Sequence, residues 1–457
     1  MHSSKSPQSK YREKAEESIK ETAKDLAAQI PKTISQFFPN FIKGIGKIKD
    51  PRKKTDYELK EILMAAIAMY ILKEGSRNSF NNDRKEQSFR ENYIKLFNME
   101  APHMDTVDDL YRLMEPEEIE KFKVSMVREL IDKKVLYKSR LKNKYFIVAI
   151  DGTGVMSFSR KHCDNCLTKQ SSCGKTTWFH NLLEAKLVCP NGLTISMATE
   201  WIENENEEYV KQDCEQKAFK RLAKKLKKNF PRLPICLVGD SLYPNQSFFE
   251  ICRNNKWEYI LTLKEGSLKS VWEEVELLLP ITEGNKEKTV ITAQQKTTKS
   301  QYRWINGINY RDYIVNWLES KEITEKKESG KKEEKRFVHL SSLPVSSKDA
   351  AAISQAGRLR WKIENEGFNE QKNRGYGLGH KYSRVSLQAA KNYYQSLQIA
   401  CIINQLIECS KKLKESIKGK LTIKHLWKNL LSFLLWGEVD QGELLKFLET
   451  KIQIRLE

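Results

Sequence analysis

The sequence lacks an apolar run long enough to cross a membrane. Its longest run, residues 62–72, is far shorter than the ~20 residues that a membrane-spanning helix needs. Residues 1–14 are polar and basic, without the apolar stretch of a secretory signal. We therefore expect a cytoplasmic protein with no membrane partner.

Cysteine is also scarce, with nine residues among 457. Their odd number, without a secretion signal, favours a reducing compartment over a framework of disulfides. The chain exceeds the length at which one hydrophobic core keeps growing, so roughly two to four structural units are expected.

Acidic residues are too few to balance the basic ones. Lysine and arginine number 80 against 60 acids, which gives a formal charge of +20 that is spread along the chain. A polyanion is the simplest partner for such a surface, and nucleic acid is the commonest polyanion. The alternative is a basic protein without such a partner.

Residues 1–140 have the periodicity of helices. Thr55 and Glu58 have the spacing of a capping box ahead of the apolar run at 59–72. Two further helical patterns cover 107–114 and 116–133. This region is either a DNA-binding domain or a helical cover for the core.

Residues 141–266 predict a mixed α/β sheet, because three strands that can pair as antiparallel neighbours precede alternating helices and strands. The second and third strands form a hairpin around Gly192. The expected strands are 145–150, 182–189, 193–202, 235–238 and 259–263, and the expected helices are 207–228 and 244–254.

The remaining sequence divides into three parts. Residues 267–348 predict an inserted β-rich module, with one solvated loop in the charged run 319–336. A strong helical pattern in 349–384 starts after Asp349 and ends before glycines at 375, 377 and 379. Residues 385–457 are again helical in pattern.

Two aspartates follow expected strands. Asp151 ends the strand at 145–150, and Asp240 follows the strand at 235–238. Open α/β sheets place their sites at the carboxyl ends of strands. Carboxylates there are suited to Mg²⁺, and a third acid would complete a pair of ions about 3.5–4 Å apart. In the alternative interpretation, each aspartate only caps a turn or a helix.

The third acid is expected on the helix after Asp349. Glu364 shares a helical face with Arg360, Trp361 and Phe368, which predicts an inward-packed face that carries one carboxylate. Glu366 aligns with charged neighbours on a solvated face and is the second choice. A simple ion pair between Arg360 and Glu364 is the structural alternative.

A cysteine-rich segment lies between Asp151 and the hairpin. Cys163, Cys166, Cys173 and His180 are suited to hold a tetrahedral Zn²⁺, and Cys214 is a substitute ligand from elsewhere in the chain. The alternative is a loop histidine among thiols that bind no metal.

Three motifs resemble those of bacterial insertion-sequence DDE transposases with the Tyr-Arg-Glu-Lys signature. Residues 360–364 with Phe368 and Lys372 resemble the signature, residues 238–243 the second-aspartate motif, and residues 149–153 the first. The resemblance covers about residues 145–384. It implies a ribonuclease-H-like core, like that of retroviral integrases, with an inserted β domain.

The resemblance also implies an activity and its partners. Asp151, Asp240 and Glu364 would hold two Mg²⁺ or Mn²⁺ ions for DNA cleavage at transposon ends and strand transfer into target DNA. Arg360 would contact phosphate or brace the acid, and Lys372 would bind the DNA backbone. A homodimer or higher oligomer would bind terminal inverted repeats in the nucleoid.

Two residues depart from the signature. Gly357 occupies the tyrosine position, and Lys372 lies one residue further from Glu364 than is usual. Two alternative functions stay open: a catalytically silent, domesticated DNA-binding protein, and a ribonuclease-H-like endonuclease without strand transfer.

Overall fold

The structure is a computed structural model that describes residues 7–53, 55–205, 211–293, 296–326, 331–417 and 422–454. It confirms a mixed α/β protein with a large mixed sheet. The chain forms two compact units. The helical unit comprises Met1–Val135, Gly154–His180 and Phe368–Glu457, and the sheet unit comprises Leu136–Thr153 and Asn181–Gly367.

The helical unit is built around the buried helix α13. Its described helices are α1 (Pro7–Phe37), α2 (Phe41–Ile45), α3 (Leu59–Ile71), α4 (Arg77–Asp83), α5 (Gln87–Phe97), α6 (Met104–Leu113), α7 (Pro116–Asp132), α12 (Glu370–Asn373), α13 (Leu387–Glu408), α14 (Lys411–Ile417), α15 (Ile423–Trp436) and α16 (Gln441–Glu449). The helical patterns predicted before residue 140 and after residue 385 are therefore confirmed. None of the described helices combines the length and apolarity needed to cross a bilayer.

Helix α13 binds the ends of its neighbours through amide side chains. The Asn404 amide donates to the carbonyl of Ile71 at 3.1 Å, at the end of α3. The Asn392 amide donates to the carbonyls of Tyr111 and Met114 at 2.9 and 2.6 Å, at the end of α6. The last carbonyls of a helix have no partner within the helix, so these bonds allow the helix ends to be buried.

The start of α3 differs from the prediction. The backbone N–H of Glu58 donates to the Glu61 carboxylate at 2.8 Å, and the helix begins at Leu59. The predicted box at Thr55 would start the helix one turn earlier and is wrong. The carboxylate that accepts the backbone N–H of the N-cap residue belongs to Glu61, which lies within the apolar segment itself.

The sheet unit contains most of a ten-stranded sheet. Its strand order is β4-β3-β1-β5-β6-β10-β9-β8-β7, and β2 (Leu167–Gln170) pairs with the first half of β3 in the helical unit. The other strands are β1 (Phe146–Phe158), β3 (Thr176–Val188), β4 (Thr194–Ile202), β5 (Ile235–Gly239), β6 (Glu258–Thr262), β7 (Lys286–Ala293), β8 (Lys296–Tyr310), β9 (Tyr313–Lys326) and β10 (Lys332–Ser341). β1, β5 and β6 are parallel.

Helices flank these strands where the sequence predicts them, although the helix predicted over 207–228 begins only at Glu215 and residues 207–210 lie outside the described residues. α8 (Glu215–Asn229) follows β4, and α9 (Gln246–Asn255) connects β5 with β6. α10 (Lys269–Leu278), which the sequence analysis missed, precedes β7. The hairpin of β3 and β4 turns at Gly192, whose φ of +98° is costly for other residues. The predicted mixed sheet and its hairpin are therefore confirmed.

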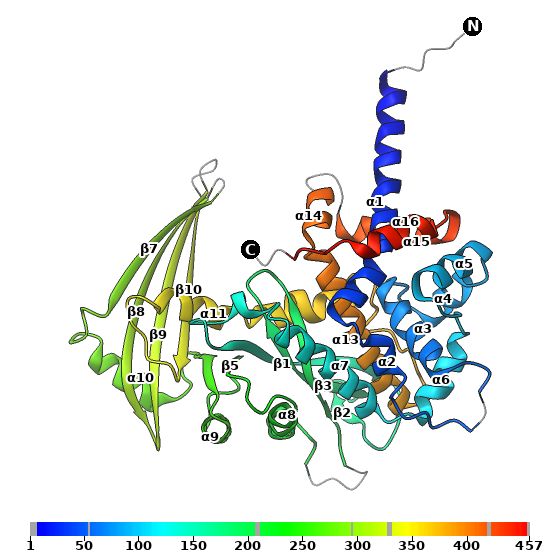
Figure 1. Cartoon of the computed structure of the whole chain (residues 1–457). Helices are drawn as coiled ribbons and strands as arrows, with labels where there is room; N and C mark the ends of the chain where they lie inside the picture. The colour runs from blue at the N-terminus through cyan, green and yellow to red at the C-terminus, as the bar shows by residue number, and fades with distance from the viewer. Residues whose placement is uncertain are drawn as a thin grey trace. The chain divides into compact units, whose positions relative to one another are not determined.

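The charged run 319–336 is mostly strand. Figure 1 shows β7 to β10 as long strands side by side, and β9 pairs with β10 over Glu319 to Glu325 and Lys332 to Val338. Residues 327–330 of the run lie outside the described residues. Glu322 faces Lys335 and Glu325 faces Lys332 in the register, so opposite charges pair across the strands. The predicted solvated loop is wrong there, because a high charge density does not prevent a strand whose neighbour carries the opposite charge.

Glu319 joins three of these strands. Its carboxylate is 1% exposed and accepts from Arg303 Nε and Arg336 Nε, each at 2.7 Å. Burial alone would raise the pKa of Glu319, but the hydrogen bonds from Arg336 and Arg303 outweigh it and lower the pKa. The ion pairs therefore favour the charged carboxylate in the folded protein.

We expect Glu319→Gln to lower the free energy of unfolding by about 1–2 kcal/mol, because two guanidinium groups lose their shared anion. A group with a lowered pKa stabilises the fold above its unfolded pKa, and this contribution disappears as the pH falls through the folded pKa. The difference between variant and wild type should therefore shrink below about pH 4. Urea unfolding at pH 7 and pH 3 measures this, and an equal difference at both values would contradict it.

Candidate active site and metal-binding cluster

Asp151 lies inside β1, not at its end. Parallel pairing with β5 stops at Ala149, but the strand continues to Phe158. The predicted strand end at Asp151 is wrong, because the chain stays extended beyond it and buries Val155 and Met156. The Asp151 side chain is 24% exposed, so the carboxylate is only partly in contact with solvent.

Asp240 directly follows β5, as predicted. Its Oδ1 accepts the backbone N–H of Leu242 at 2.9 Å, which closes the turn after the strand. Ala149 and Val238 are partners in the parallel register, and each aspartate lies two residues beyond its member of this pair. The sheet therefore brings Asp151 and Asp240 to the same edge.

Glu364 lies in a π-helical turn, Ile363–Asn369. α11 (Ala350–Arg358) ends before this turn and α12 (Glu370–Asn373) follows it, so the predicted continuous helix is wrong. A π-turn changes the helical period, and such turns are frequent at functional sites. Trp361 is 51% exposed, which contradicts the inward-packed face expected for it.

The carboxylates act on one another electrostatically. Burial raises the pKa of Asp151 to about 6, with further increases from Asp240 and Glu364, while Arg360 and the N–H of Gly152 oppose the shift. The Arg360 guanidinium lies 3.7 Å from the Asp151 carboxylate. The three predicted acids and Arg360 therefore lie near one another in the sheet unit.

A fourth carboxylate, Glu215, lies at the same place and was missed by the sequence analysis. Burial raises the pKa of Glu215, and Asp151 and Asp240 raise it further. A Cβ added to Gly152 would lie 2.4 Å from Glu215 Oε1, so the glycine permits this close approach. Two signals in the sequence could have indicated Glu215. A glycine, Gly152, follows Asp151, and Glu215 itself is an acid in the first turn of α8.

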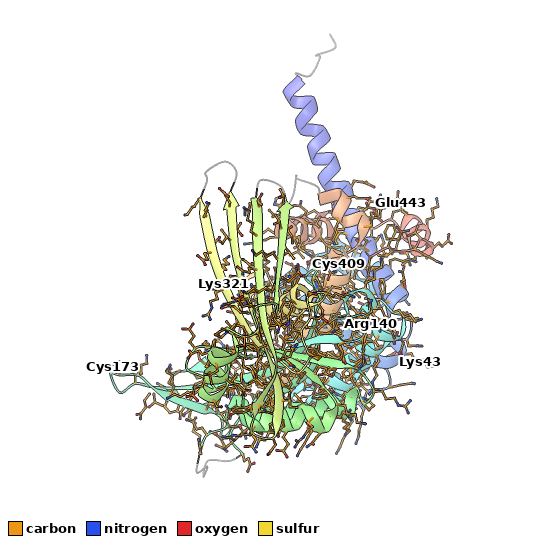
Figure 2. All side chains as sticks on the ribbon, turned by 90° about the vertical axis from the view of Figure 1, so that its left-hand side faces the viewer. Lys43, Arg140, Cys173, Lys321, Cys409 and Glu443 are labelled. Atoms are coloured by element: carbon orange, nitrogen blue, oxygen red, sulfur yellow. The ribbon has the colours of Figure 1, made fainter. Side chains whose placement is uncertain are left out.

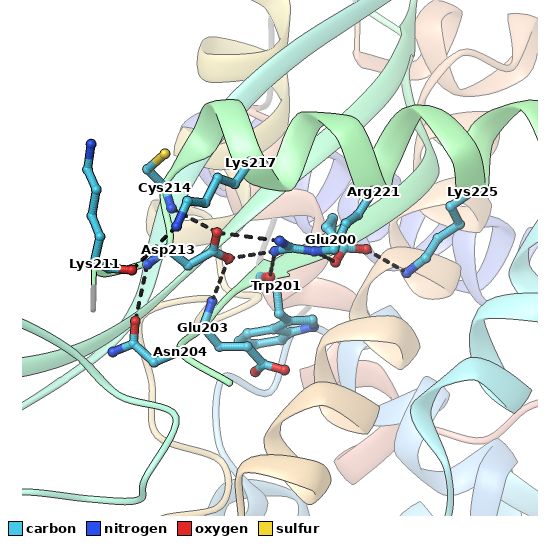
Figure 3. A network of polar contacts seen from close by, with 10 residues as sticks. All are labelled: Glu200, Trp201, Glu203, Asn204, Lys211, Asp213, Cys214, Lys217, Arg221 and Lys225. Carbon is cyan, nitrogen blue, oxygen red and sulfur yellow. Dashed lines mark hydrogen bonds and ion pairs between the residues drawn. The ribbon is translucent and has the colours of Figure 1, made fainter. Parts of the chain in front are cut away.

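A polar network anchors the start of α8 and thereby positions Glu215. Figure 3 shows Arg221 between Asp213 and Glu200, with ion-pair distances of 2.5 and 2.7 Å. The Asp213 carboxylate also accepts the backbone N–H groups of Glu203 at 3.2 Å and Cys214 at 2.9 Å. The end of β4 and the first turn of α8 are therefore held together.

Two basic cavities that share part of their lining lie in the sheet unit, and one of them adjoins Asp240. One, of about 540 Å³, is lined by Asp240, Arg336, Arg360 and His339 among others. The second, of about 820 Å³, shares Phe337, Arg358 and Trp361 with the first. Its lining contains one carboxylate and six basic side chains: Lys138, Arg140, Lys142, Lys335, Arg358 and Lys362.

Several basic residues of the second cavity also form ion pairs. Arg358 pairs with Glu322 at 2.6 Å, and Lys362 pairs with Glu366 at 2.7 Å. Glu366, the second choice for the third acid, therefore forms an ion pair with a neighbouring lysine. Lys372 is exposed on α12 and belongs to the helical unit.

A separate donor cluster lies in the helical unit. Among the described residues, His162, Cys163, Cys166 and His180 form the one group of three or more His, Cys, Asp or Glu residues whose ligand atoms all lie within 4.8 Å of one another. Asp151, Asp240 and Glu364 do not form such a group. These distances alone therefore support a single-ion site at the His/Cys cluster and not at the acids.

The predicted zinc ligand set needs one correction. Cys173 is exposed at the tip of the β2–β3 hairpin, where Figure 2 labels it, and His162 takes its place in the cluster. The hairpin carries Cys173 away because β2 pairs with β3 over four residues before the turn. Cys214 is exposed at the start of α8 and is not part of the cluster either.

Comparison of the sequence with protein-family models and with curated proteins finds no match.

Proposed function

We propose that the chain is a DDE transposase, which cleaves DNA at transposon ends and joins those ends to target DNA. The resemblance of the three acid motifs to those of insertion-sequence transposases suggests this function. The observation that carries the proposal is that Asp151 and Asp240 lie at one edge of a sheet with Glu364 near them, so that both neighbours add to the rise that burial causes in the pKa of Asp151.

The strand order supports a ribonuclease-H-like core. Strands β4-β3-β1-β5-β6, with β1, β5 and β6 parallel, have the order and direction expected of that fold. Asp151 lies on β1, Asp240 directly follows β5, and Glu364 lies on the helical turn after α11, in the order that the resemblance implies. In this proposal, β7 to β9 and α10 are the inserted module, and β10 continues the sheet beside β6.

The donor set fits Mg²⁺ or Mn²⁺. Carboxylate oxygens are hard ligands that these ions prefer, and a divalent cation would offset the burial and the repulsion that raise the pKa of Asp151. Asp151, Asp240 and Glu364 would hold two ions, and Glu215 lies near enough to add a ligand. Ions bound there would supply charge stabilisation for the attacking and leaving oxygens, and a two-ion site does not require that all the acids surround one ion.

The basic residues would position the DNA. Arg360 lies beside Asp151 and lines the cavity that contains Asp240, so its guanidinium is suited to bind a phosphate next to the reacting one. The six basic residues of the larger cavity would follow the DNA backbone away from the acids. A homodimer or higher oligomer would bind terminal inverted repeats and target DNA together.

We expect the double variant Arg140→Ala/Lys142→Ala to weaken DNA binding by a similar factor for every sequence tested. Each lost phosphate contact should lower the slope of log affinity against log salt by about 1. Fluorescence anisotropy between low and moderate salt measures both effects. Lys288→Ala, an exposed site on β7 outside both cavities, is the matched control. An unchanged salt slope in the double variant would exclude the cavity as a DNA site.

The proposed function is tested with the full chain, Mg²⁺ and DNA fragments that flank its own coding sequence. A supercoiled plasmid serves as target, and sequencing identifies the products. We expect cuts that leave a 3′-OH at defined ends, followed by joining to the plasmid. Cutting without joining would support the nuclease alternative, and binding without cutting would support the silent DNA-binding protein.

A further inference from the structure

We infer that His162, Cys163, Cys166 and His180 hold a structural Zn²⁺ ion. This site is separate from the proposed DNA chemistry, and its ligands all lie in the helical unit. His162, Cys163 and Cys166 come from the segment between β1 and β2, and His180 comes from β3. The ion would therefore tie a loop to a strand.

Four of the distances among the donors are close to the edges of a zinc tetrahedron, and all the donors lie within 4.8 Å of one another. Bonds of about 2.3 Å to sulfur and about 2.05 Å to nitrogen imply separations of about 3.8 Å for S···S, 3.5 Å for S···N and 3.4 Å for N···N. The two sulfurs are 3.7 Å apart, and His180 Nε2 lies 3.5 and 3.3 Å from Cys163 and Cys166. His180 Nε2 and His162 Nδ1 are 3.3 Å apart. The sulfur separation is far too long for a disulfide, whose bond is about 2.05 Å.

The surroundings of His162 leave its Nδ1 available as a ligand. Its Nε2 lies 3.0 Å from the carbonyl oxygen of Arg384, which can only accept a hydrogen bond, so Nε2 carries the proton. The lone pair is then on Nδ1, which faces the cluster. A backbone carbonyl that fixes the tautomer in this way is typical of histidines that bind metals.

Aromatic packing further orients the imidazole. The Phe158 ring stacks on the His162 ring with centroids 4.2 Å apart and an angle of 8° between the planes. The Lys381 ammonium lies 4.4 Å from the centre of the Phe158 ring. His162 is therefore held in position from its ring face and from Nε2.

The ligand set favours a structural role for the ion. Two thiolates and two imidazoles complete a four-coordinate shell, whereas catalytic zinc sites keep one position for water or substrate. His180 is 0% exposed and Cys166 is 4% exposed, so substrate would have little access to the ion. Thiolate ligands also favour Zn²⁺ over Mg²⁺ and Mn²⁺.

Metal analysis of the full chain, purified without a polyhistidine tag, tests the inference. We expect about one zinc per chain in the wild type and a loss of most of it in Cys163→Ser and Cys166→Ser. Cys173→Ser, in the same segment but outside the cluster, should keep the full amount. A wild type that contains no zinc after reduction and incubation with Zn²⁺ would overturn the inference, as would full zinc binding by Cys166→Ser.

A second measurement does not require the variants to fold. Alkylation of the wild-type protein, read by mass spectrometry, should spare Cys163 and Cys166 while the exposed Cys173 and Cys214 react. A zinc chelator should then make the first pair reactive. Rapid labelling of Cys163 before chelation would contradict the inference. Zinc content is independent of DNA cleavage, so either proposal can fail without the other.

Discussion

Asp151→Asn, Asp240→Asn and Glu364→Gln are each expected to slow Mg²⁺-dependent DNA cleavage by ~10³-fold or more. Each substitution removes one negative charge and one hard oxygen ligand but keeps the size of the side chain. Loss of charge at this site should leave DNA affinity unchanged or slightly higher. Single-turnover cleavage and a binding assay at the same salt concentration separate the two effects.

Two further glutamates provide controls for the assignment of the third acid. Glu366→Gln removes the ion pair with Lys362, and Glu370→Gln removes the ion pair with Arg374 at 3.0 Å. Both variants should cleave within a few-fold of the wild type. If Glu366→Gln were inactive and Glu364→Gln active, Glu366 would be the third acid. If all three acid variants cut normally, the proposed enzyme activity would be wrong.

Gly357→Tyr is expected to destabilise the protein by about 3 kcal/mol or more, although it restores the residue of the signature. A Cβ at Gly357 would lie 2.7 Å from two atoms of the His339 ring and 2.9 Å from Ile260 Cγ2. The His339 ring is buried and has no space to move aside. The same contacts explain why glycine stands at the tyrosine position.

Smaller substitutions test the same contact. Gly357 is in α11, where alanine would otherwise be preferred by up to about 1 kcal/mol, so any net loss in Gly357→Ala reflects the clash. This loss should shrink when His339→Ala is also present, as measured by a double-mutant cycle of unfolding free energies. Gly284→Ala, which meets no atom within 4 Å, is the control. Equal effects at both glycines would contradict the explanation.

Elements with a strong local pattern were predictable. The strand at 235–238 is a short apolar run before a glycine, and the structure has β5 at Ile235–Gly239. The turn at Gly192 was recognisable because few other residues tolerate its backbone conformation. Asp240 then follows from the position of the strand end.

Features that depend on distant partners were not predictable. Asp151 looked like a strand end because Gly152 follows it, whereas the glycine accommodates Glu215 from another element. The charged strands β9 and β10 were missed because the charge pattern of this run does not reveal its pairing with neighbouring strands. The π-turn at Glu364 likewise breaks the helical period on which the inward-packed face was predicted.

The sequence by itself determined most of the elements around the acids, their order, and the kinds of ligand that each segment carries. Periodicity, glycines and capping residues act over a few positions, so these properties are readable locally. Only the tertiary structure decided that Glu215 joins the acids and that His162, instead of Cys173, joins the His/Cys cluster. The physical reason is strand pairing. The register between two strands decides which side chains lie near a site whose other residues are distant in the sequence.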